Sequence, residues 1–174
     1  MKSPKTKELD FIIDKLTNSI ENIVTGDNFQ TEVSVVTKED LKHITKKNKW
    51  DFNWMIELKN PAKEVYKLTI VNNPNVIQGL VSLEIMLDHI HMHLLESAPF
   101  NKGKNKMYAG VAGNLVAFTC RRAFQMGHEG NIAFKAKTQL IEHYTKSLGA
   151  FHIGRANILI DTEVALKLTN KYFK

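Results

Sequence analysis

The stretch from Asp88 to Pro99 most constrains what this 174-residue chain can fold into, together with a run of small residues at 109–115 that follows about ten residues later. Histidines stand at every second position, at His89, His91 and His93, and side chains alternate between the two faces of a strand with period two. The small residues lead into apolar residues at helical spacing, which predicts a loop entering an amphipathic helix. A strand with titratable side chains would therefore lie beside a helix N-terminus, whose free N–H groups attract anions.

Hydrophobic spacing predicts the remaining elements. Leu9, Ile12, Ile13 and Leu16 follow the i, i+3, i+4 rule, which predicts an N-terminal helix over residues 5–24. Several consecutive strands, followed by alternating strands and helices, predict one mixed α/β sheet with helices on both faces, in a single domain spanning 1–174. By the same reasoning we expect strands at 29–36, 54–58, 65–71, 76–87, 89–97, 131–134 and 151–160, and helices at 38–48, 109–126, 138–148 and 162–173.

Composition narrows the class of protein. Apolar residues make up 43% and charged residues 24% of the chain, as in ordinary globular proteins. The net charge is +6, but the lysines are spread along the chain rather than gathered with aromatic residues, so we do not expect nucleic-acid binding. The single cysteine, Cys120, rules out an intramolecular disulfide. Neither a signal-peptide core nor a membrane span is evident, so we expect a cytoplasmic protein.

Two motifs give the chain a family resemblance. Met107-Tyr108-Ala109-Gly110-Val111-Ala112 is similar to the pattern Arg/Gln-x-x-Gly-x-Gly/Ala, with Met107 where Arg or Gln is usual. The helix at 140–150, with Tyr144 and Gly149, is similar to the pattern Ala-x-x-x-Tyr-x-Lys-x-Gly-Phe. Both patterns belong to the GNAT superfamily of acetyl-coenzyme A dependent N-acetyltransferases. The strand at 91–97 resembles that of the serotonin N-acetyltransferase branch, which also carries two histidines at this spacing.

The resemblance implies a GNAT-like acyl-CoA N-acyltransferase fold, with a mixed, mostly antiparallel, splayed sheet flanked by helices. It implies acetyl-CoA as cosubstrate, with the pantetheine arm hydrogen-bonded to the backbone of Leu95 and Ser97. Lysines 102, 104 and 106 in the approach loop are candidates to pair with its phosphates. The pyrophosphate is expected on the backbone of a turn made by Tyr108, Ala109, Gly110, Val111, Ala112, Gly113 and Asn114.

The chemistry of acetyl transfer assigns roles to three side chains. An amine attacks a thioester only when it is unprotonated, and histidine has a suitable pKa to take its proton, so His91 or His93 is the candidate base. Tyr144 is the candidate acid that protonates the departing thiolate, a role carried by the resemblance. We expect direct attack in a ternary complex on a primary amine. Strand alternation puts Glu96 on the face opposite the two histidines.

Other functions stay open from the sequence. The same fold without turnover would bind coenzyme A or a protein partner. The spacing of His89, His91 and His93 also suits a metal site, with Glu84 or His143 as a fourth ligand, although we expect no metal. A homodimer is compatible with the sequence. The residues do not identify the amine acceptor.

Overall fold

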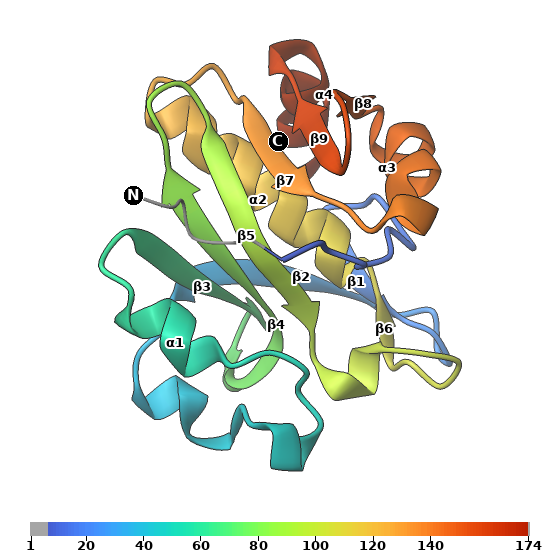
Figure 1. Cartoon of the computed structure of the whole chain (residues 1–174). Coiled ribbons are helices and arrows are strands. Elements are labelled where there is room, and N and C mark those ends of the chain that lie inside the picture. The colour runs from blue at the N-terminus through green and yellow to red at the C-terminus, as the bar shows by residue number, and fades with distance from the viewer. Residues whose placement is uncertain (1–6, 174) are drawn as a thin grey trace.

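The computed structural model describes residues 7–173, and these build one nine-stranded sheet with helices on both sides (Figure 1). The strand order is β6-β1-β2-β3-β4-β5-β7-β9-β8. The strands are β1 (Ser19–Asn22), β2 (Asn28–Val35), β3 (Lys63–Ile70), β4 (Asn73–Ile85), β5 (Ile90–Ser97), β6 (Tyr108–Ala109), β7 (Ile132–Lys135), β8 (Phe151–His152) and β9 (Asn157–Ile160). The α-helices are α1 (Trp54–Lys59), α2 (Val111–Gln125), α3 (Ile141–Leu148) and α4 (Thr162–Tyr172).

Helices α1 and α2 cover opposite faces of the sheet (Figure 1). On one face, Gly79 of β4 lies so close to α2 that a Cβ atom there would come within 2.7 Å of the Val111 side chain. Helix α4 packs along α2 on the same side. On the other face, Trp54 of α1 is fully buried against the sheet. The buried apolar side chains of the two faces form the core that holds β4 and β5 in place.

Strands β5 and β7 diverge, and this divergence positions the site. They are the parallel pair of the sheet, and their register is limited to Ile90 with Ile132 and His91 with Ala133. The other strand pairs of residues 7–173 are antiparallel. Beyond His91, strand β5 continues to Ser97 while β7 turns away. The expected mixed, mostly antiparallel, splayed sheet is confirmed.

The predicted N-terminal helix over 5–24 is wrong for the residues that the structure describes; residues 5 and 6 lie outside them. The chain is extended from Leu9, which forms a parallel bridge with Ala136, and reaches β1 at Ser19. Leu9, Phe11 and Ile13 are buried while the residues between them are exposed. This is the period of a strand, and the free edge at the end of β7 supplies the backbone partners that favour it.

Three further elements differ from expectation. Residues 54–58 form helix α1 instead of a strand, because the Asn53 side chain caps it by accepting a hydrogen bond from the Ile56 N–H. The expected helix at 38–48 is two short 3-10 turns, Glu39–His43 and Lys46–Asn48. The expected strand at 151–160 is the hairpin of β8 and β9, which turns at Gly154, where φ is +112°.

Candidate functional site

A cleft of about 400 Å³ lies at the end of β5. Its walls are the last residues of β5, the loop after it, the first turn of α2, and an extended N-terminal segment, residues 9–14, which we call the strap. The cleft occupies the region where β5 and β7 have separated. Five of the predicted cofactor-binding residues line it: Leu95, Ser97, Tyr108, Val111 and Ala112.

The N-terminus of α2 forms the floor of the cleft. Gly110 precedes the helix with φ +100°, and a Cβ atom there would meet the Ser19 carbonyl at 3.0 Å, so this position requires glycine. The amides of the first helical turn have no intrahelical acceptor. Those of Val111 and Ala112 belong to residues that line the cleft. These two amides and the helix dipole suit an anion such as a phosphate.

Four other predicted cofactor-binding residues do not line the cleft: Gly110, described above, and Ala109, Gly113 and Asn114. Ala109 is paired with β1 through Glu21. A Cβ atom at Gly113 would come within 2.8 Å of the Lys15 carbonyl, so this glycine permits close packing of the chain that precedes β1. The Asn114 amide donates to the carbonyls of Ser19 and Gly110, at 3.2 and 2.8 Å. Gly113 and Asn114 therefore fasten the N-terminal region to α2.

Tyr144 projects from α3 toward the strap. It is fully buried, and its ring lies between Phe11 and Phe134, with centroid distances of 4.7 and 5.2 Å. Its hydroxyl donates a 2.6 Å hydrogen bond to the Phe11 carbonyl. Burial raises the pKa of Tyr144 well above its ordinary value, so the phenol is protonated at neutral pH. Tyr144 does not itself line the cleft, although its hydrogen-bond partner Phe11 does, and its role as the acid stays a prediction.

His91 and His93 lie at the start of β5, away from the residues that line the cleft. Their rings are 4.6 Å apart, and His93 Nε2 is 2.8 Å from Glu84 Oε1. Burial, with the nearby His93 and His89, lowers the pKa of His91 to about 4; burial also lowers the pKa of His93. Both imidazoles are neutral at neutral pH. Their role as the base stays a prediction.

Glu96 lies on the same face of the sheet as His91, so the predicted opposite placement is wrong. The register shifts between Ser82 and Leu83, which inserts His93 as an extra residue in β5 and reverses the alternation beyond it. Glu96 accepts hydrogen bonds from the Asp51 amide at 2.7 Å and from Trp54 Nε1 at 2.8 Å. Its buried carboxylate ties the loop before α1 to the edge of the cleft. A lone carboxylate in an apolar strand was the sequence signal for this contact.

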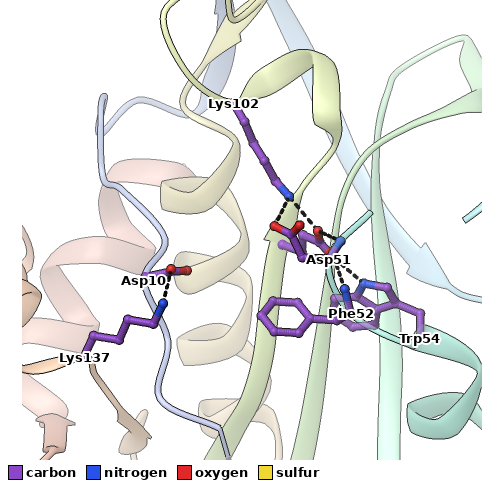
Figure 2. Close-up of polar contacts among 7 residues, drawn as sticks. Asp10, Asp51, Phe52, Trp54, Lys102 and Lys137 are labelled. Atoms are coloured by element: carbon purple, nitrogen blue, oxygen red, sulfur yellow. Dashed lines mark hydrogen bonds and ion pairs between the residues drawn. The ribbon is translucent and has the colours of Figure 1, made fainter. Parts of the chain in front are cut away.

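Two of the three lysines expected to meet phosphates reach the cleft, Lys102 and Lys106. Lys102 Nζ lies 2.6 Å from Glu96 and 3.0 Å from Asp51 (Figure 2). Although burial opposes it, these hydrogen bonds raise the pKa of Lys102. Lys106 Nζ lies 2.8 Å from Asp14, and Lys104 is exposed in the loop. Carboxylates of the protein itself therefore pair with both cationic side chains of the cleft.

Two other expectations can be examined in residues 7–173. Within that range, no three His, Cys, Asp or Glu side chains gather closely enough to hold a metal ion. Cys120 is fully buried, and burial raises the pKa of its thiol. None of the described helices has the length and apolar character needed to cross a membrane.

Comparison with known proteins finds similarity in structure. No family model and no curated protein sequence matches the chain. Spermidine N-acetyltransferase from Vibrio cholerae, in complex with CoA and spermine, is 16% identical with a TM-score of 0.55, over 79% of this chain and 98% of that one. FeeM, an N-acyl amino acid synthase from uncultured soil microbes, is 10% identical with a TM-score of 0.56, over 81% and 95%. AtaTR bound with AcCoA is 14% identical with a TM-score of 0.52, over 79% and 97%. The chain therefore has the fold of the GNAT N-acetyltransferases.

Proposed function

We propose that the protein is an N-acetyltransferase that moves an acetyl group from acetyl-CoA to a primary amine. The observation that carries this proposal is the cleft itself, where the amides at the start of α2 lie beside the splayed end of β5. CoA is present in the structure of the Vibrio cholerae enzyme, and AcCoA in that of AtaTR. The small side chain of Ala112, which lines the cleft, leaves room for a phosphate group to approach the backbone.

The residues of the cleft would divide the work of binding. Acetyl-CoA supplies an activated acetyl thioester when it is bound. The amides of Val111 and Ala112 would hold the pyrophosphate, with the rest of the 108–114 turn shaping the approach. Leu95 and Ser97, on the part of β5 that has left β7, would offer backbone hydrogen bonds to the pantetheine arm. Lys106 Nζ and the Gly110 N–H both donate to Asp14, so this lysine lies near the start of α2.

Proton transfer would follow from the protonation states of the buried groups. Tyr144 keeps its proton at neutral pH and would give it to the departing thiolate. His91 or His93, neutral at the same pH, would accept the proton of the amine, through water because neither side chain lines the cleft. Cys120 is excluded as a nucleophile by its complete burial, which supports direct attack of the amine in a ternary complex.

Substitution of Gly110 tests this placement. Gly110→Glu places a side chain against the Ser19 carbonyl, strains the left-handed turn that begins α2 and adds a negative charge next to the proposed anion site, so we expect CoA affinity to fall at least about tenfold by titration calorimetry. Gly127→Glu is the matched control, because Gly127 has a left-handed φ of +78°, open space around it, and a place beyond the far end of α2. Circular dichroism would confirm that both variants fold. Wild-type affinity in a folded Gly110→Glu variant would contradict the placement.

A module that binds CoA without turnover is the second candidate. The observation that favours it is the hydrogen bond from the Tyr144 hydroxyl to Phe11, which already engages the proposed acid. Thiol release from acetyl-CoA over a panel of primary amines separates the two functions. Binding of CoA with no thiol release above the rate without protein would favour the module.

A further inference from the structure

The strap lies in the wedge that the separation of β5 and β7 creates (Figure 1, dark blue). The Leu9 N–H donates to the Lys135 carbonyl at 2.7 Å, and the Lys137 N–H donates back to the Leu9 carbonyl at 3.0 Å. These bonds continue the edge of β7 beyond the point where β5 has left it. The strap therefore follows the path of an added strand at the splayed edge.

The same segment engages two groups that the proposed function requires. Asp14 Oδ1 accepts a 2.9 Å hydrogen bond from the Gly110 N–H, and Asp14 Oδ2 lies 2.8 Å from Lys106 Nζ. The Phe11 carbonyl accepts the Tyr144 hydroxyl. The strap thus contacts both the anion site at α2 and the proposed acid on α3.

The contacts of Asp14 reproduce the chemistry of phosphate recognition. A negatively charged oxygen at a helix N-terminus, held by a backbone amide and by a lysine, is the arrangement that binds phosphate groups. Asp14 and Asp10 both line the cleft, but the Asp14 side chain is only 18% exposed, whereas that of Asp10 is 52% exposed and pairs with Lys137 at 2.8 Å (Figure 2). Of these two carboxylates, only that of Asp14 meets the amide at the start of α2.

We propose that the strap is autoinhibitory: Asp14 occupies the place of a cofactor phosphate and must leave it before CoA binds. This inference rests on the proposed function. Leu9 and Phe11 are buried and anchor one end of the strap, whereas Ile12 is 50% exposed and Asp14 makes only polar contacts with the cleft. Ile13 is also buried, so release of the segment 12–14 must withdraw Ile13 from its buried position while Leu9 stays on β7.

Two charge-neutralising variants test the inference by titration with CoA. Asp14→Asn keeps the side-chain shape and a hydrogen-bond acceptor for Gly110, but it removes the charge that opposes a phosphate. We expect its dissociation constant for CoA to fall about three- to tenfold. Asp10→Asn is the control in the same segment and cleft, and we expect a change of less than about twofold. An equal gain in both variants would show a general charge effect and overturn the proposal.

Hydrogen exchange provides a readout that does not depend on affinity. The Ile13 N–H donates to His143 Nε2 at 2.9 Å, and the Leu9 N–H to Lys135. We expect CoA to speed exchange at Ile13 and to leave Leu9 protected. If CoA binds and the Ile13 amide exchanges at an unchanged or slower rate, the proposed release of the strap is wrong, while the proposed function stands. If neither the wild type nor the folded Asp14→Asn variant binds CoA, both the autoinhibition proposal and the proposed function are wrong.

Discussion

Polar side chains have different surroundings at the two ends of β5. At its start, His91 and His93 lie on the face of the sheet that α1 covers, and burial keeps both imidazoles neutral. At its end, Leu95–Ser97 border an open cleft where carboxylates and lysines gather. One strand therefore carries a desolvated imidazole pair and, a few residues on, a charged site beside a helix N-terminus. The end of β5 offers the binding groups, and the start offers only neutral acceptors.

Tyr144 gives the largest expected effect on this comparison, because we propose it as the acid and its hydroxyl donates to Phe11, which lines the cleft at the end of β5. Tyr144→Phe removes the hydroxyl and keeps the ring between Phe11 and Phe134. We expect turnover of acetyl-CoA with an accepted amine to fall by about 10²–10⁴-fold, as for loss of a general acid, with nearly unchanged CoA affinity. Steady-state thiol release and calorimetry measure the two quantities.

Tyr172→Phe is the control for that experiment. Tyr172 is also a buried tyrosine with a raised pKa, and within residues 7–173 its hydroxyl has no hydrogen-bond partner. It lies on α4, outside the residues that line the cleft. We expect wild-type turnover in this variant. Full turnover in Tyr144→Phe would remove the proposed acid from the mechanism.

Glu96, at the cleft end of β5, tests the comparison through its contribution to protein stability. Its side chain is 2% exposed and is held by two backbone amides, Trp54 and Lys102. Glu96→Ala leaves the two backbone amides and Trp54 Nε1 without this acceptor, while Lys102 keeps Asp51, and we expect the free energy of unfolding to fall by about 3 kcal/mol in urea titrations. Glu142→Ala, which removes an exposed carboxylate paired with Lys146, should leave the free energy of unfolding nearly unchanged. A small loss at Glu96 would mean that the loop before α1 is held mainly by apolar packing.

The elements around the site follow from local pattern, which is why the sequence predicts them. The apolar spacing in β4, β5 and α2 is typical of only one type of secondary structure in each case. Their backbone hydrogen bonds form within the element or with an element that is adjacent in sequence. Gly110 is required by a local left-handed turn, so it is visible as a glycine before a helix. The fold is therefore predictable from the sequence, whereas the position of the anion site in the 108–114 turn stays a prediction.

The conformation of the strap and the face on which Glu96 lies depend on contacts between distant parts of the chain, which the local sequence pattern does not indicate. Leu9 and Ile13 fit both a helical period and a strand period, and the choice is made by the open edge of β7, more than a hundred residues away. The contact between Asp14 and Gly110 joins positions 96 residues apart. The bulge at His93 adds one residue to the register, and that single residue moves Glu96 to the other face.

The start of β5 gives the smallest expected effect, a change in how stability depends on pH. The ordinary pKa of His91 is 6.5 and burial lowers it to about 4, so between these values the unfolded chain binds a proton that the native protein does not. The stability from neutral His91 is complete above pH 6.5 and is lost as the pH falls toward 4. Between pH 7 and pH 5 we expect His91→Gln to lose about 1 kcal/mol less unfolding free energy than wild type, allowing for solvent screening. His152→Gln, at an exposed position, should match wild type in urea titrations at both pH values. If the wild type, His91→Gln and His152→Gln lose the same unfolding free energy between pH 7 and pH 5, burial of His91 does not distinguish the start of β5 from its end.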